Sequence, residues 1–165
     1  MTCHVHSAFT GKCEDAEEER IVSVTAAALP FFVYGTLRPG EVNHGLLLRG
    51  RTRAEEPALL PDAVLYAGPG YPYAVHAPGG TVTGDLVTAH PWAYDALLAE
   101  LDRLEEYRPG DPHTLYERVE RATVVRAAGG PPVRAWVYLA GPVVAARLRA
   151  CGELIEGGDW RARRR

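Results

Sequence analysis

The chain is short of the residues on which several classes of protein depend. It has only three cysteines, Cys3, Cys13 and Cys151, and their odd number and scattered positions argue against a disulfide framework and a zinc site. Cys3 and Cys13 lie close in sequence to His4 and His6, but the spacing does not predict a structural metal there. A reducing compartment is therefore the expected environment.

Long apolar runs and a strong charge of either sign are also missing. No apolar segment approaches the length that crosses a bilayer, and no basic region followed by a long apolar stretch marks a signal peptide. The formal net charge of -3 predicts no broad field for nucleic acid. The basic C-terminus, residues 161–165, is interpreted as a solvated end, with contact to a polyanion as the alternative. These features predict a cytoplasmic protein without membrane or nucleic-acid partners, and they give no oligomeric state.

A convincing enzymatic nucleophile is absent as well. Ser7 and Ser23 lie in the N-terminal region, Cys151 has no His nearby in sequence, and no Gly-x-Ser-x-Gly elbow occurs. A cysteine-dependent hydrolase that uses Cys151 is therefore a remote alternative. A lone His44 is expected to cap or pack a helix start rather than to orient a substrate.

Two regions of the chain differ in composition. Residues 1–28 contain an acidic run at 14–19 and little periodic apolar content, so we expect a flexible or loosely attached extension. An alternating segment at residues 22–25 is open to a second interpretation as a short strand. Residues 29–165 are predicted to form a single domain with a short basic tail.

Short strands separated by Gly and Pro turns dominate residues 29–165. The alternation and the turn dipeptides predict strands at 63–66, 73–76, 81–87, 116–126 and 133–140, and helices at 43–48, 91–107 and 142–149. There is no alternation of strand and helix of the kind that builds a parallel sheet. We therefore predict an α+β fold, with a small mixed, mainly antiparallel β-barrel flanked by a few helices.

The segment from Phe31 to Gly40 reads as a buried strand that stops in a glycine-rich loop. Such a loop presents backbone N–H groups with few side chains in the way, which suits a carboxylate or a polarised carbonyl. The loop has the glycine spacing of a phosphate-binding loop, but Glu41 and Val42 follow where Lys and Ser or Thr are required. Nucleotide binding is therefore not expected. The alternative is an ordinary turn without a ligand, in which residues 38 and 39 are exposed.

Two adjacent glutamates end the helix predicted over residues 91–107. At 100° per residue, Glu105 lies about 40° from Leu101 and falls on the apolar stripe, whereas Glu106 lies about 140° away and faces solvent. The stripe consists of Tyr94, Leu97, Leu98, Leu101 and Leu104. Burial should raise the pKa of Glu105 and suit it to general acid/base catalysis. The alternative is that Glu105 pairs with an arginine such as Arg118.

The loop and the helix end belong to an ordered set of motifs that resembles gamma-glutamylcyclotransferase-like proteins. The set covers about residues 30–140 and comprises Phe32-Val33-Tyr34-Gly35-Thr36-Leu37-Arg38-Pro39-Gly40, Asn43-His44, Gly70-Tyr71-Pro72, Val82-Thr83-Gly84-Asp85-Leu86, Leu101-Asp102-x-x-Glu105-x-Tyr107, Tyr116-x-Arg118 and Trp136-Val137-Tyr138. Similar proteins often have Gly where this chain has Glu106. Residues 1–28 are not part of the resemblance.

The resemblance implies a fold, a reaction and a site. The implied reaction is intramolecular: the α-amino group of a γ-glutamyl compound attacks its own γ-carbonyl, forming 5-oxoproline and releasing an amine or amino acid. The implied catalytic residue is Glu105, and the implied substrate-binding residues are Tyr34, Gly35, Thr36, Leu37 and Tyr116. No metal or organic cofactor is implied.

That chemistry accounts for the residue types present. Nucleophile and electrophile belong to one molecule, so the enzyme needs no nucleophile of its own. One carboxylate can take the proton of the α-ammonium and then give a proton to the leaving amine, while N–H groups of the Gly35 loop stabilise the oxyanion. The alternative function is a catalytically inactive module on the same fold that binds small molecules or proteins.

Overall fold

The computed structural model describes residues 28–125 and 129–164. Its sheet is built from five strands, β1 (Phe31–Val33), β2 (Thr52–Ala67), β3 (Pro72–Ala89), β4 (Tyr116–Val125) and β5 (Val133–Ala140). The hydrogen-bonded order is β1-β3-β2-β4-β5, with antiparallel neighbours throughout. One parallel pair, Phe31 with Trp136, joins the two ends of this order into a ring. The predicted α+β class is confirmed. Within the described residues, β1 and β5 are joined by this single pair of residues.

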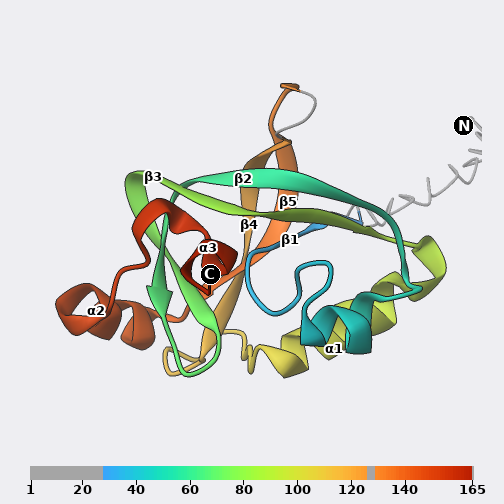
Figure 1. Cartoon of the computed structure of the whole chain (residues 1–165). Helices are drawn as coiled ribbons and strands as arrows, with labels where there is room; N and C mark the ends of the chain where they lie inside the picture. Colours follow the sequence, from blue (N-terminus) through green and yellow to red (C-terminus); the bar gives the residue numbers. More distant parts are fainter. Residues whose placement is uncertain (1–27, 126–128, 165) are drawn as a thin grey trace, which may run out of the picture.

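The helices lie beside the sheet and at its ends (Figure 1). They are η1 (His44–Leu48), a π-helix, then η2 (Pro91–Ala93), α1 (Tyr94–Leu104), α2 (Pro142–Cys151), η3 (Glu156–Gly158) and α3 (Trp160–Arg163). All three predicted helices are confirmed, as η1, as η2 with α1, and as α2. Helix α1 ends three residues earlier than expected. The sequence did not predict η3 and α3. Within the described residues, every helix is too short or too polar to cross a membrane. The predicted extension lies outside the described residues, apart from residue 28.

Strands β2 and β3 form one long hairpin that crosses the molecule (Figure 1). The sequence predicted a break at Pro78-Gly79-Gly80, and this prediction is wrong. The register shifts between Pro61 and Ala63, where Asp62 has a φ of 55° and its Oδ1 accepts a 2.9 Å hydrogen bond from the Gly79 N–H. The two strands therefore continue past the glycines as a β-bulge, which bends the ladder without ending it.

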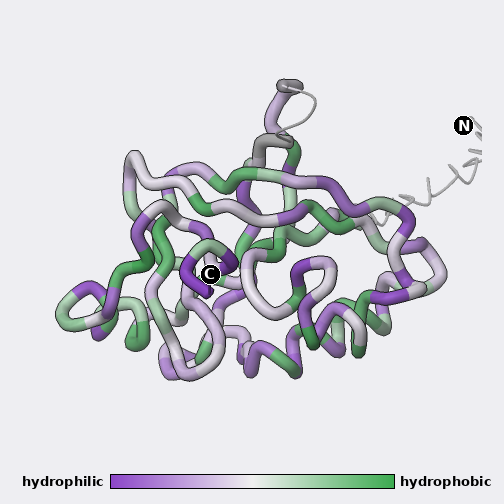
Figure 2. Tube along the Cα trace, viewed as in Figure 1, coloured by the Kyte–Doolittle hydropathy of each residue, from purple (hydrophilic) through white to green (hydrophobic). Residues whose placement is uncertain are grey.

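Strand β1 is buried on both faces, as its run of apolar residues predicts. Phe31 and Val33 pack into one apolar cluster with α1, whereas Phe32 and Tyr34 pack into a second cluster with β2, β3 and β5. Figure 2 shows hydrophobic and hydrophilic stretches alternating along α1, whose buried Leu97 and Leu101 cover β1.

The glycine of the Val82–Leu86 motif lets β1 lie close to β3. A Cβ on Gly84 would collide with the Val33 carbonyl oxygen and stand 2.6 Å from the Phe32 ring. No side chain fits in that space, so glycine is required for this approach. The approach fixes the end of β1, and with it the loop that follows.

Candidate active site

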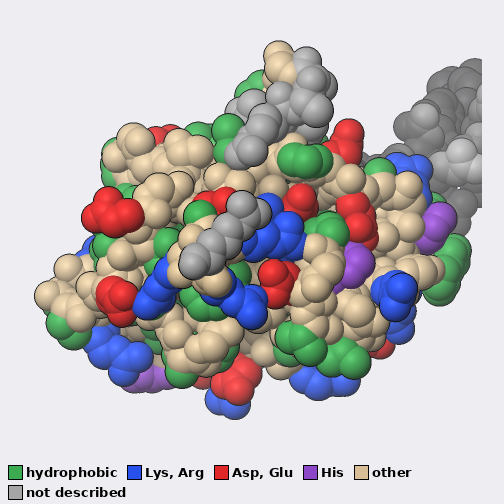
Figure 3. Space-filling view, in the orientation of Figure 1, with side chains coloured by type: hydrophobic (Ala, Val, Ile, Leu, Met, Phe, Trp, Pro, Cys, Tyr) green, Lys and Arg blue, Asp and Glu red, His purple; other side chains and the backbone are tan. Residues whose placement is uncertain are grey.

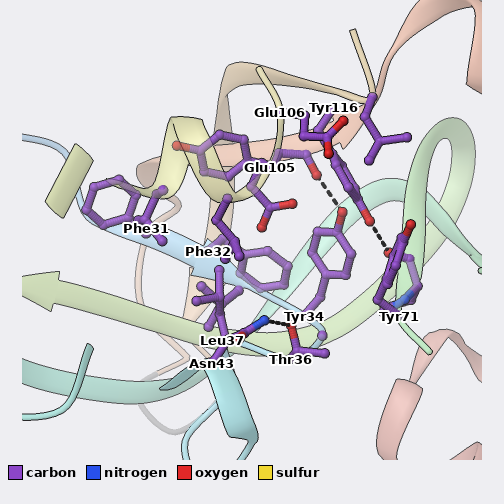
Figure 4. A pocket seen from close by; sticks show the side chains of 17 residues that line it. Phe31, Phe32, Tyr34, Thr36, Leu37, Asn43, Tyr71, Glu105, Glu106 and Tyr116 are labelled. Atoms are coloured by element: carbon purple, nitrogen blue, oxygen red, sulfur yellow. Dashed lines mark hydrogen bonds between the residues drawn. The ribbon is translucent and has the colours of Figure 1, made fainter. Parts of the chain in front are cut away.

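A cavity of about 320 Å³ opens where the end of β1, the tip of the β2–β3 hairpin and the C-terminus of α1 meet (Figure 4). All six residues that the sequence predicts for the site line this cavity. They are Tyr34, Gly35, Thr36, Leu37, Glu105 and Tyr116. The structure therefore brings together residues that lie about 70 positions apart in the chain.

Glu105 is the C-cap residue of α1 and is half-buried. Its carboxylate points into the space between the rings of Phe32 and Tyr34 (Figure 4), and within the described residues it has no hydrogen-bond or ion-pair partner. Burial raises the pKa of this carboxyl from 4.5 to about 7. Glu105 is thus half-ionised near neutrality, as a group that both takes and gives a proton should be.

The expected alternative partner of Glu105 is engaged elsewhere. Arg118 places Nη1 3.0 Å from an oxygen of Asp102, and its guanidinium lies 4.8 Å from the ring centre of Trp136. The same aspartate accepts a 2.6 Å hydrogen bond from the Tyr138 hydroxyl. The interpretation of Glu105 as a partner of Arg118 is therefore wrong.

Glu106 occupies a different environment from its neighbour, as the helical geometry predicts. It is exposed and adopts a φ of 51°, and its side chain points away from the Phe32 and Tyr34 rings (Figure 4). The Glu106 N–H donates to the Arg103 carbonyl and the Tyr107 N–H donates to the Asp102 carbonyl, which is the Schellman ending of a helix. Glycine is the usual residue at this left-handed position, which explains why similar proteins often have Gly there.

One member of the predicted apolar stripe is not buried. Leu104 is 39% exposed, because α1 ends there and the chain turns away. Its side chain borders the cavity instead of filling the core.

The Tyr34 side chain braces the loop. Its buried hydroxyl donates to the Tyr138 carbonyl and accepts a 3.3 Å hydrogen bond from the Ala74 N–H. Burial, followed by the nearby carboxylate of Glu105, raises the pKa of Tyr34 well above its usual value, so the phenol stays protonated. Tyr34 therefore contributes its ring to the cavity wall while its hydroxyl ties β5 to β3.

The next three residues, Gly35, Thr36 and Leu37, also line the cavity. In the part of the chain that the structure describes, the N–H groups of Gly35, Thr36 and Leu37 donate to no protein acceptor. The Thr36 carbonyl accepts from the N–H of Asn43 at 3.1 Å, and the Thr36 hydroxyl accepts from the Asn43 side chain at 2.9 Å. The start of η1 thus holds the loop from behind and leaves three donors available.

An aromatic wall faces this loop. The Tyr116 hydroxyl donates to the Pro72 carbonyl at 2.8 Å, and the Tyr116 ring lies 4.9 Å from that of Tyr73. Burial is the main cause of a raised pKa at Tyr116, so its hydroxyl is a hydrogen-bond donor and not a proton acceptor. Tyr71 stands at the tip of the hairpin and completes the wall.

Sequence reasoning gave no role to several residues that line the cavity. Two residues that it did not favour for a role in the site, Cys151 and His44, lie outside the cavity lining. It quoted Asn43, Tyr71, Pro72 and Tyr138 in motifs but gave them no role, and all four line the cavity. Cys151 is exposed and does not line it. Likewise His44 packs as expected, with Nε2 2.7 Å from a Glu55 oxygen.

The charged residues that line the cavity, within the described chain, are all acidic. Among its lining residues within the described chain, Glu105 and Glu106 are acidic, and none is Lys, Arg or His. In the same described part of the chain, no three His, Cys, Asp or Glu side chains are grouped as metal ligands. The cavity thus combines one buried acid, free backbone donors and an aromatic wall.

Comparison with known proteins identifies relatives of this chain. A curated relative from Niallia circulans, gamma-L-glutamyl-butirosin B gamma-glutamyl cyclotransferase, is 33% identical over 111 residues, which are 66% of this chain and 64% of the relative. The chain thus matches less than two thirds of that relative's length. A solution structure of an Arabidopsis thaliana protein is 27% identical, with a TM-score of 0.60, over 82% of this chain and 74% of that one.

Further comparisons support the same grouping. The solution structure of the Escherichia coli protein ytfP is 28% identical, with a TM-score of 0.54, over 83% of this chain and all of that one. The family model described as "Gamma-glutamyl cyclotransferase, AIG2-like" matches residues 31–162, which include every strand and the whole cavity. The chain therefore belongs to the gamma-glutamyl cyclotransferase, AIG2-like family.

Proposed function

We propose that the protein is a gamma-glutamyl cyclotransferase that releases 5-oxoproline, with Glu105 as its general base and acid. One observation carries this proposal: a half-buried carboxylate without a partner faces a loop with three free N–H groups across one cavity. The first feature moves protons and the second stabilises negative charge. A reaction that needs both, and no enzymatic nucleophile, fits the residues present.

The proposed reaction proceeds within the substrate. Glu105 takes a proton from the α-ammonium, and the freed amine forms a bond to the γ-carbonyl carbon. The bond from that carbon to the leaving nitrogen then breaks, and the proton on Glu105 passes to this nitrogen. The ring nitrogen gives up a second proton as the tetrahedral intermediate collapses, and this proton goes to the released amine, which leaves as an ammonium ion. Glu105 is again a carboxylate and the ring nitrogen keeps one N–H, so protons balance over the cycle.

The loop at Gly35, Thr36 and Leu37 stabilises the negative charge of the substrate. Its N–H groups serve the oxyanion of the tetrahedral intermediate and the α-carboxylate of the glutamyl group. A single donor to an oxyanion typically contributes about 3 kcal/mol to the lowering of the barrier. Tyr116 and Tyr71 exclude water from this region, which strengthens those hydrogen bonds.

We further propose that the leaving group is an amine and not an amino acid. A γ-glutamyl amino acid brings a second carboxylate, for which the cavity offers no basic side chain, and Glu106 stands at its border. A neutral or cationic amine meets no such penalty. The curated relative is named for the γ-glutamyl compound gamma-L-glutamyl-butirosin B. With about 320 Å³ of space, the cavity holds the glutamyl group, and the rest of the amine extends past the rim.

The test is 5-oxoproline release from paired substrates, a γ-glutamyl alkylamine and a γ-glutamyl amino acid of matched side-chain length. We expect kcat/KM to favour the amine. Glu105→Gln should lose about 10²- to 10⁴-fold in kcat, the usual contribution of a general base, with its circular dichroism unchanged. Glu106→Gln has the same chemistry one residue away and should retain near-normal turnover.

Two results would contradict the proposal. Full turnover by Glu105→Gln would remove this carboxylate from the mechanism. Binding of γ-glutamyl compounds by the wild-type protein without any 5-oxoproline would favour the inactive binding module.

A further inference from the structure

Arg38 lies in the middle of residues 34–40, which we call the substrate loop. Its side chain is buried and pairs with two aspartates. Its Nε lies 2.7 Å from an oxygen of Asp85 on β3, and its Nη1 lies 3.0 Å from an oxygen of Asp159, near the end of the described chain. Its side chain is only 7% exposed. The expectation of an exposed turn at Arg38 is therefore wrong, because both partners lie far away in sequence.

The C-terminal helix α3 makes further contacts with the same loop. Arg161 directs Nε to an oxygen of Glu41 at 3.3 Å and donates through Nη2 to the Pro39 carbonyl. Arg164 reaches the second oxygen of Glu41 at 2.9 Å. The interpretation of this basic segment as a solvated end is wrong for Arg161, which is partly buried, whereas Arg164 is exposed and pairs with Glu41 at the surface. In Figure 3, basic and acidic side chains alternate around α3, so this face carries no continuous basic patch.

The segment is also anchored independently of the loop. Trp160 is 6% exposed and packs in the apolar cluster that contains Tyr34. Asp159 caps α3 by accepting a 3.0 Å hydrogen bond from the Arg161 N–H. Residues 159–164 therefore form a fixed element, which we call the strap, that clamps the outer edge of the loop while η1 holds its inner edge.

We infer that the strap holds the substrate loop in its binding conformation, so that Arg161 and Glu41 act as positioning residues although neither lines the cavity. The inference rests on the proposed function, because it concerns how the loop binds a γ-glutamyl group. Residues 34–40 belong to no strand, so contacts with other segments have to hold the conformation of the loop. If release of the strap left one loop in ten in the binding conformation, the apparent affinity would fall about tenfold.

Hydrogen exchange tests the strap without any use of catalysis. Arg161→Gln removes both contacts to the loop, whereas Arg163→Gln makes the same charge change on the same helix but breaks only an exposed pair with Glu153. We expect amide exchange at Arg38 and Glu41, whose N–H groups donate to the carbonyls of Gly35 and Arg38, to accelerate at least fivefold in Arg161→Gln and to stay at the wild-type rate in Arg163→Gln. Equal exchange in the two variants would overturn the inference.

Kinetics supply the second readout. We expect Arg161→Gln and Glu41→Gln each to raise KM about three- to tenfold, with kcat within twofold of wild type and an unchanged pH midpoint of kcat. The effects of the two substitutions should be less than additive in the double variant, because the two residues share the contact between Arg161 and Glu41. A fall in kcat at constant KM, or full additivity, would overturn the positioning role. If the wild type releases no 5-oxoproline, the proposed function fails, and exchange still decides whether the strap holds the loop.

Discussion

Burial of Glu105 should cost the folded protein stability at neutral and alkaline pH. In the folded state the pKa of this carboxyl is raised from 4.5 to about 7, so between these values the native state holds a proton that the unfolded state has lost. Stability rises with pH only where the unfolded state binds more protons. Here the native state binds more, so the contribution of Glu105 is present below pH 4.5 and is lost as the pH rises through about 7.

The size of this loss follows from the same two values. At about 1.4 kcal/mol for each pH unit between them, ionisation of Glu105 in the folded state costs about 3 kcal/mol above pH 7. Because the side chain is only half-buried, this figure is an upper bound. Glutamine has nearly the same shape as the neutral acid and does not ionise, so Glu105→Gln should avoid the cost.

Urea denaturation of the wild type and of Glu105→Gln, at pH 4.5 and at pH 8, measures this difference. We expect similar midpoints at pH 4.5 and a variant that is more stable by about 2–3 kcal/mol at pH 8, although it has lost its turnover. Glu106→Gln is the matched control and should follow the wild type. A stability difference between wild type and Glu105→Gln that does not change with pH would refute the conclusion that burial raises the pKa of Glu105.

Three further outcomes are expected. Wild-type kcat/KM should fall about tenfold per pH unit below a midpoint near 7, the pKa of Glu105; a midpoint near 4.5, measured over pH 4–9, would contradict the role of this residue. Glu106→Gly should raise the unfolding free energy by about 0.5–1 kcal/mol, because glycine adopts the left-handed C-terminal position without strain, and chemical denaturation checks this. In Gly35→Ala the new Cβ would stand 2.8 Å from the Pro72 ring, so the hairpin tip must shift; we expect a KM raised several-fold, and an unchanged KM would show that the wall of the cavity is not used.

Local patterns predicted much of the fold and the centre of the site. The apolar run at Phe31 predicted a buried strand, and the helical period separated Glu105 from Glu106, because both signals act over one or two turns of chain. The substrate-binding roles of the loop residues and of Tyr116 came from the resemblance, and these residues line one cavity.

The predictions were wrong for residues whose conformation or burial depends on a contact with a residue far away in the sequence. Pro78-Gly79-Gly80 looks like a turn, but the Asp62 side chain holds Gly79 in a bulge. Arg38 looks like a turn residue until Asp85 and Asp159, 47 and 121 positions later, are brought beside it.

The long sequence separation between the strap and the loop also determines when their contacts can form during synthesis. Proteins emerge from the ribosome with their N-terminal end first, and contacts across long stretches of chain form late. The loop at Gly35 leaves the ribosome early, but its contacts with Arg161 and Arg164 span 120 residues or more. The sheet can begin to assemble from β1, β2 and β3 while the loop still lacks its clamp. The cavity of a nascent chain is therefore completed only when almost the whole domain has been made.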